Sequence, residues 1–213
     1  MAVILDIIAA MMIGGVLLMV TTQGIERSLR EFVNHNADAI MQAELASMTQ
    51  TVQEDLRKMG YGIPESQQLS IIQAATTSRL VFLAKQNPNA ANADTVEYTT
   101  GTPDTTIIID SPVITYDITR TLRRAGQQPQ STLIGRVINP VLFRYLDQAG
   151  NQVADIRSTR MVEVTLVTLN PHVYLDDDVI QAPTALLRTK ALKNLWRESY
   201  WRQTRVVSRN LRR

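Results

Sequence analysis

The first 22 residues of the chain, MAVILDIIAAMMIGGVLLMVTT, form an apolar run in which Asp6 is the only charged side chain. About 20 consecutive apolar residues match the roughly 30 Å hydrocarbon core of a bilayer, and helices of soluble cores rarely stay apolar on every face for that length. The run therefore predicts a membrane-inserted helix over residues 1–24. A cleaved secretory signal is the alternative, but no Lys or Arg precedes the run and no small-x-small cleavage site follows Val20.

Asp6 is energetically unfavourable in a membrane-inserted helix. An ionised carboxylate at the centre of a bilayer costs about 2.5 kcal/mol or more and usually marks a partner or a function. The nearest cation along the chain is the α-amino terminus, and the amino terminus of a neighbouring copy would serve equally well. Asp6 therefore indicates assembly with other copies, unless it lies shallow enough to reach the membrane interface.

Residues 25–60 predict an amphipathic continuation of the helix. Apolar residues recur every three to four positions from Ile25 to Met59, which places them along one stripe of a helix. The segment Gly60-Tyr-Gly-Ile-Pro64 follows, and glycine at a C-cap with a proline shortly beyond is a helix stop signal. We expect a stem helix that ends near Met59 and packs its apolar stripe on the rest of the chain.

Residues 61–213 alternate between segments rich in β-branched or aromatic residues and turn-forming segments. After a short helix expected within Ser66–Thr76, strands are predicted over Arg79–Ala84, Thr95–Thr100, Thr105–Asp110, Val113–Arg120, Val137–Asp147, Arg160–Leu169 and Trp201–Leu211. Successive strands joined by short turns form antiparallel sheets. The predicted fold class is α+β, with a long N-terminal membrane and stem helix packed on a C-terminal antiparallel β-sheet head over 61–213.

Little in the composition points to catalysis. The chain has no cysteine and two histidines, His35 and His172, neither with a metal-ligating neighbour at the usual spacing. Gly-rich phosphate loops and nucleophile elbows are absent from the sequence. Asp176, Asp177 and Asp178 could bind Ca²⁺, although a solvated acidic loop is the favoured interpretation. We predict that the protein is not an enzyme and needs no cofactor.

The C-terminal tail is strongly basic. From Arg188 onward the net charge is +8, against −6 for the rest of the chain, so the two parts should attract each other. The interleaved basic and aromatic residues of this tail could bind a single-stranded nucleic acid or an anionic surface. These candidate contact residues are Arg197, Trp201, Arg202, Arg205 and Arg209. A charged edge strand that avoids aggregation explains the same residues and is the favoured interpretation.

Four motifs occur in a characteristic order along the chain. They are Asp55-Leu-Arg-Lys-Met-Gly-Tyr-Gly62 at the end of the stem, then Tyr145-Leu-Asp-Gln-Ala-Gly150, Val162-Glu-Val-Thr-Leu166 and the closing Arg209-Asn-Leu211. With the long apolar helix and its early acid, they make the chain resemble the type IV pilin superfamily. The finer resemblance is to its larger minor members, the PilW-type minor pilins and the J-type pseudopilins of type II secretion.

This resemblance implies a structural subunit of a type IV pilus-like or type II secretion pseudopilus filament. Asp6, where the family usually has glutamate, would compensate the amino-terminal charge of a neighbouring subunit, and Glu26, Arg27, Arg30 and Glu31 would pair between stems. The expected partners are other copies, sibling pilins, an inner-membrane assembly platform and membrane lipid. The expected location is the inner membrane before assembly and an extracytoplasmic filament afterwards. A membrane-anchored extracytoplasmic binding module for nucleic acid or anionic surfaces is the alternative.

Overall fold

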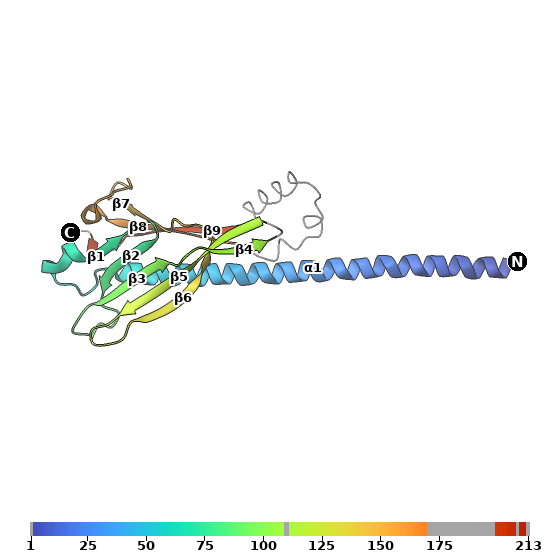
Figure 1. The fold of residues 1–213 in the computed structure, drawn as a ribbon, viewed down its shortest axis with the longest axis horizontal. Coiled ribbons are helices and arrows are strands. Elements are labelled where there is room, and N and C mark those ends of the chain that lie inside the picture. The colour runs from blue at the N-terminus through green and yellow to red at the C-terminus, as the bar shows by residue number, and fades with distance from the viewer. Residues whose placement is uncertain (1, 109–110, 170–198, 208, 212–213) are drawn as a thin grey trace. The chain divides into compact units, whose positions relative to one another are not determined.

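The computed structural model describes residues 2–108, 111–169, 199–207 and 209–211. One α-helix comes first, followed by short 3-10 helices (η) and β-strands (Figure 1). Their bounds are α1 (Ala2–Lys58), η1 (Glu65–Ser70), β1 (Ile72–Ala75), β2 (Arg79–Ala84), β3 (Asp94–Thr100), β4 (Asp104–Ile108), β5 (Ser111–Arg123), β6 (Gln130–Val137), β7 (Phe143–Leu146), η2 (Ile156–Ser158), β8 (Met161–Thr168), β9 (Tyr200–Val207) and η4 (Arg209–Leu211).

The chain divides into two compact units, which we call the helix unit (Met1–Ile40) and the β-sheet unit (Met41–Arg213). The helix unit consists of the first part of α1. Among the described residues, α1 is the one helix long and apolar enough to cross a membrane. The remainder of α1, from Met41 to Lys58, belongs to the β-sheet unit.

Two antiparallel sheets form the β-sheet unit. The larger has six strands in the order β1-β2-β3-β5-β4, with β6 also paired to β5, and the smaller has the order β7-β8-β9. Strands β3 and β4 pair with successive parts of β5, so that Thr100 lies opposite Ile118 and Asp104 lies opposite Thr115. The described residues therefore have the predicted α+β layout of a long N-terminal helix packed on antiparallel sheets.

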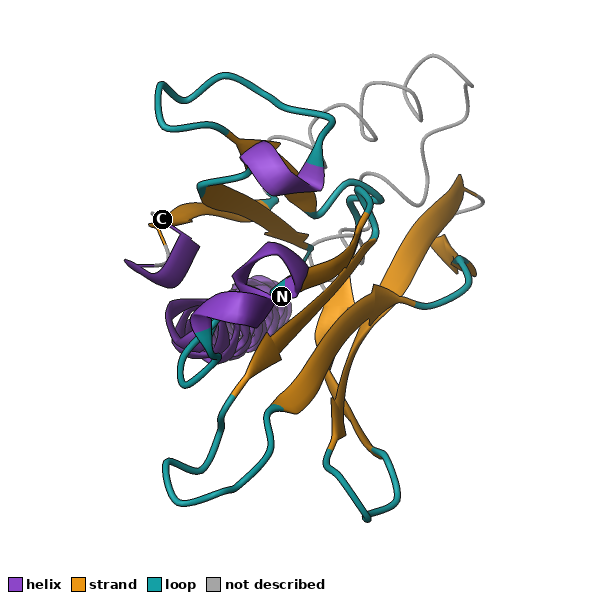
Figure 2. Cartoon of the chain, turned by 90° about the vertical axis from the view of Figure 1, so that its left-hand side faces the viewer, coloured by secondary structure: helices purple, strands orange, loops and turns teal. Residues whose placement is uncertain are grey.

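The final part of α1 lies between the two sheets (Figure 2). Its buried residues follow the three-to-four spacing that the sequence predicted, and burying such a side chain stabilises the fold by about 1.5–3 kcal/mol. The helix contributes Leu45, Met48, Val52 and Leu56, and Met59 follows directly after it; the larger sheet contributes Leu80, Phe82, Val96, Tyr98 and Ile118; the smaller contributes Phe143, Val162, Val164, Leu166 and Val206.

Two glycines shape this packing. Gly60 has a φ of 74°, and its N–H donates to Leu83 O at 2.8 Å, so the predicted glycine C-cap also ties the helix end to β2. Gly135 lets β6 approach the helix, because a Cβ atom at that position would lie 2.1 Å from Met48 Sδ. Any larger residue at position 135 would have to displace a buried methionine.

Some predicted elements were wrong. Ser66–Thr76 is not one helix but η1 followed by strand β1. The predicted strand Val137–Asp147 is interrupted, because Pro140 lacks an N–H and the Asn139 side chain bonds to Val167 N and Thr165 O instead. Strand β6 was missed, since its first four residues are all exposed and show no alternation. The predicted final strand ends at Val207 and is followed by η4.

Candidate functional site

The helix unit exposes large apolar side chains all around its axis. From Ile4 to Val20 every large apolar side chain that the structure describes is 53–74% exposed. Monomeric soluble proteins rarely leave a continuous apolar surface of this extent in contact with water. This surface belongs to the one described helix that is long and apolar enough to span a membrane.

The polar groups of this segment are compatible with an apolar environment. The Thr21 hydroxyl donates to Leu17 O at 2.8 Å, and the Thr22 hydroxyl donates to Leu18 O at 2.9 Å. These bonds satisfy the hydroxyl protons within the helix, as a hydrocarbon environment requires. Asp6 is the charged exception, and its side chain is exposed.

Small residues lie near Asp6 on α1. Residues three and four apart lie on the same side of an α-helix, which places Ala9 and Ala10 one turn from Asp6, with Gly14 one turn beyond Ala10. Ile13, seven positions after Asp6, lies on the same side, so this side is not uniformly small. Small residues such as Ala10 and Gly14 let a second helix approach closely within a membrane.

The next part of the helix unit is also exposed. Ile25, Leu29, Phe32, Val33 and Ile40 are 50–70% exposed, whereas the stripe continues in the β-sheet unit as buried residues from Leu45 onward. The predicted stem charges Glu26, Arg27, Arg30 and Glu31 are exposed on the same segment. The predicted apolar stripe therefore has two different environments, one covered within the chain and one open to partners.

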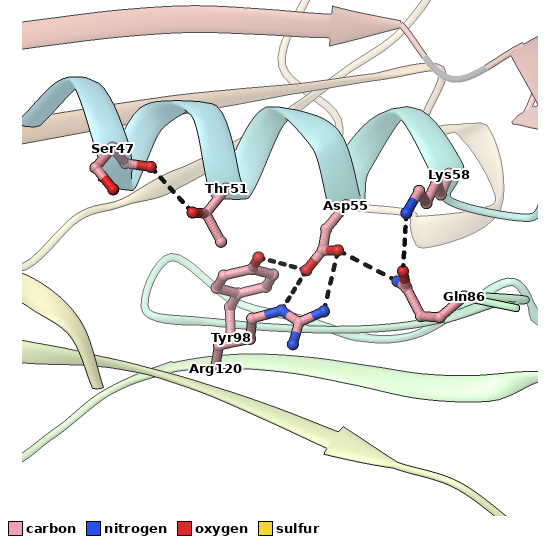
Figure 3. Close-up of polar contacts among 7 residues, drawn as sticks. All are labelled: Ser47, Thr51, Asp55, Lys58, Gln86, Tyr98 and Arg120. Carbon is pink, nitrogen blue, oxygen red and sulfur yellow. Dashed lines mark hydrogen bonds and ion pairs between the residues drawn. The ribbon is translucent and has the colours of Figure 1, made fainter. Parts of the chain in front are cut away.

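Asp55 is a buried carboxylate that anchors α1 to the larger sheet (Figure 3). It accepts hydrogen bonds from Tyr98 Oη at 2.6 Å, from Arg120 Nε at 2.5 Å and Nη2 at 3.1 Å, and from Gln86 Nε2 at 3.2 Å. Lys58 Nζ donates to Gln86 Oε1 at 3.2 Å. One acid of the helix thus binds residues of β3, β5 and the segment after β2.

The electrostatics of this cluster are those of a structural contact. Burial, and then the negative charge of Asp55, raise the pKa of the Tyr98 hydroxyl. The hydrogen bond to Asp55 raises the pKa of Arg120. The Tyr98 hydroxyl therefore stays protonated and the Arg120 guanidinium stays charged, and in these forms both donate hydrogen bonds to the Asp55 carboxylate. Sequence reasoning noted Asp55 in a motif but missed this role, although an acid between Val52 and Leu56 on a buried stripe was an available signal.

Two buried glutamates lie beneath pairs of arginines. Glu163 on β8 is 1% exposed and accepts hydrogen bonds from Arg205 Nε at 2.6 Å and from Arg144 Nη1 at 3.4 Å. Burial would raise the pKa of Glu163, but the hydrogen bond and charge of Arg205 outweigh it and hold that pKa below its usual value. Another buried acid, Glu97 on β3, also forms ion pairs with two arginines, Arg79 at 2.8 Å and Arg123 at 2.7 Å.

The predicted basic and aromatic tail is only partly brought together. Trp201 and Arg205 share one face of β9, whereas Arg202 lies on the opposite face because side chains alternate along a strand. Arg205 is already bonded to Glu163. Arg197, the Arg209 side chain and the acidic residues Asp176, Asp177 and Asp178 lie outside what the structure describes. The described tail residues therefore do not form one continuous row.

A cofactor or metal site has little support in the described part of the chain. Within it there is no cluster of three or more His, Asp or Glu side chains that could hold a metal ion. An open hollow of ≈ 340 Å³ lies between the β2–β3 and β5–β6 connections and is lined in part by Asn92, Asp94 and Arg124.

In comparisons with known proteins, no protein-family model, no curated protein and no solved structure matches the chain. Its class is therefore defined by the chain itself, as an α+β protein whose N-terminal helix is long and apolar enough to span a membrane.

Proposed function

We propose that the protein is a structural subunit of a filament of the type IV pilus or type II secretion pseudopilus kind, similar to PilW-type minor pilins and J-type pseudopilins. The observation that carries the proposal is the helix unit, whose apolar side chains are exposed on all sides around one acid, Asp6. An acid is costly in a simple membrane anchor, whereas in a helix that binds other helices it can pair with a neighbour's charge and fix the register.

In this proposal the helix unit has two successive environments. Before assembly, lipid covers the apolar side chains and the subunit is held in the membrane. In the filament, helix units of neighbouring subunits replace the lipid, and the face with Ala10 and Gly14 allows close approach. Asp6 then pairs with the amino-terminal charge of a neighbour, which neutralises both groups in an apolar core and sets the axial register.

The proposal is tested by Asp6→Ala in the full-length protein expressed with its assembly machinery. We expect the variant to insert into the membrane and fold but to lose filament incorporation, measured by the amount of protein in sheared filament fractions. Asp6→Glu, which keeps the charge, should retain most incorporation. Glu54→Ala removes an exposed carboxylate of α1 outside the apolar run and serves as the matched control. Wild-type incorporation of Asp6→Ala would refute the role of Asp6.

A membrane-anchored binding module is the second candidate, and the 67% exposure of Trp201 supports it. Exposed aromatic side chains can stack on the bases of a single strand. The arginines support it less, because Arg205 is bonded to Glu163 and Arg202 lies on the other face of β9. Salt-dependent binding of single-stranded DNA by the detergent-solubilised protein, lost in Trp201→Ala, would favour this candidate over the filament subunit.

A further inference from the structure

The smaller sheet has a basic patch on its outer face, which we define as Arg144, Trp201, Arg205 and Val207 together with the buried Glu163. The register places Arg144, Glu163 and Arg205 side by side across β7, β8 and β9. One carboxylate beneath two guanidinium groups leaves a net charge of +1. The arginines are 51% and 61% exposed, and Glu163 holds both in place, so they are prepared to bind a further anion.

The larger sheet has an acidic patch on its outer face, which we define as Asp104, Asp117, Leu133 and Arg136. Arg136 Nε bonds to Asp117 Oδ1 at 2.8 Å, and Arg136 Nη2 lies 3.8 Å from Asp104 Oδ2. Two carboxylates around one guanidinium leave a net charge of −1. The strand register places Leu133, which is 59% exposed, on the same face of β6 as Arg136.

The two patches differ in charge and in direction. Each lies on the side of its sheet that faces away from α1, and Figure 2 shows the two sheets on different sides of the helix. One copy therefore cannot pair its own patches, but two copies can pair them head to tail. Such a heterologous contact leaves one free patch at each end, and its repetition generates an open filament when the rotation does not close.

The side chains of the patches are of the kinds found in protein interfaces. Tryptophan and arginine dominate binding energy at interface hot spots, and complementary charge fixes register and excludes wrong partners. Trp201 and Leu133 supply an exposed apolar anchor on each patch. We propose that the β-sheet units of two copies bind each other with the basic patch of one copy on the acidic patch of the next. This inference rests on the proposed filament function and names the surfaces that meet within it.

Cross-linking tests the contact directly, because the chain has no native cysteine. Full-length Val207→Cys and Ser131→Cys variants, which keep Trp201 and Leu133, are co-expressed in one membrane and treated with a short bifunctional maleimide. We expect a mixed dimer from this pair. The matched control replaces Val207→Cys by Arg202→Cys, which is exposed on the opposite face of β9. We expect the control pair to yield about fivefold less dimer, or about 1 kcal/mol.

Charge reversal gives a second, independent measurement. Asp104 is 61% exposed, so Asp104→Lys should leave the unfolding transition unchanged while it reverses the sign of the acidic patch. We expect the variant to lower the yield of the mixed dimer by about fivefold, and raised salt to lower the yield of the pair without this charge reversal similarly. A yield unaffected by Asp104→Lys would overturn the assignment of the acidic patch.

A cysteine in the helix unit separates failure of this inference from failure of the proposed function. Self-cross-linking of Ala10→Cys in the same membranes reports whether helix units associate. If Ala10→Cys cross-links but the Val207 and Ser131 pair yields no more than its control, the patch contact is wrong and the filament proposal stands. If Ala10→Cys does not cross-link, the filament proposal fails, and this inference fails with it.

Discussion

Asp55 illustrates how much a single side chain can decide in this fold. Its carboxylate accepts bonds from Tyr98, Arg120 and Gln86, and Arg120 is only 21% exposed. Asp55→Asn keeps the size of the side chain but leaves that guanidinium without its counter-charge. Breaking a buried ion pair costs about 3–5 kcal/mol, and we expect a loss near the lower end, about 3 kcal/mol, in the free energy of unfolding. Urea unfolding of the detergent-solubilised protein, followed by circular dichroism, measures it.

The neighbouring carboxylate provides the control for this prediction. Glu54 is exposed on the same helical turn and bonds only to the exposed Gln50 among its described neighbours. Glu54→Gln should change the free energy of unfolding by less than about 0.5 kcal/mol. Equal losses in the two variants would show that burial of Asp55 contributes nothing specific.

Among the secondary-structure elements, β9 connects the C-terminal part of the chain to β8 and to α1. It pairs with β8 over its whole length and buries Val206, while Thr204 Oγ1 accepts a bond from Gln53 Nε2 at 2.7 Å. Deletion of Trp201–Arg213 would open the edge of β8 and leave Glu163 without Arg205. We expect the truncated protein to lose its cooperative thermal transition or to aggregate, as measured by circular dichroism and light scattering.

Charge reversal at Arg212 and Arg213 is the control for the deletion, because both residues follow β9 and η4 in the sequence. The double reversal should leave the thermal transition unchanged, since both residues come after the last paired strand in the sequence. A truncated protein that melts like the full-length one would mean that the tail is a detachable arm. The nucleic-acid-binding candidate would then gain support.

The stability of the complete protein should fall at both ends of the pH scale. The folded state lowers the pKa of Glu163, so its contribution is present above the unfolded value of about 4.3 and is lost as pH falls through the folded value. Burial raises the pKa of Tyr98 and Tyr145, so their contribution is present below about 10 and is lost as pH rises above it. We expect a plateau in the free energy of unfolding between these limits.

Two substitutions assign the ends of this plateau in urea-unfolding measurements across pH. Glu163→Gln should be less stable than wild type at pH 7, and the difference should shrink as pH falls below about 4.3. Tyr145→Phe should lose stability less steeply than wild type above pH 10 or so. A Glu163→Gln variant with an unchanged acid slope would show that other carboxylates control the acid transition.

Local sequence patterns were sufficient where one segment decides its own structure. The apolar run predicted the membrane-competent helix, and the glycine stop signal predicted the helix end before Gly60. Branched and aromatic residues predicted β2, and alternation predicted most of β3 and β8. Each of these depends on residues within a few positions of one another, so hydrophobic period and capping contain the required information. The general α+β layout followed from their order along the chain.

Only the tertiary structure decided which side chains meet. Asp55 binds Tyr98 and Arg120, which lie 43 and 65 positions away, and Arg205 covers Glu163 from 42 positions away. An acidic residue in a helix or strand is expected to be exposed to solvent unless its cationic partner is known. The sequence therefore did not predict the burial of Asp55 or Glu163. The sequence did not predict strand β6 for the same reason. Pairing with β5 and the close contact of Gly135 with Met48 stabilise this strand, and its own sequence has no strand pattern.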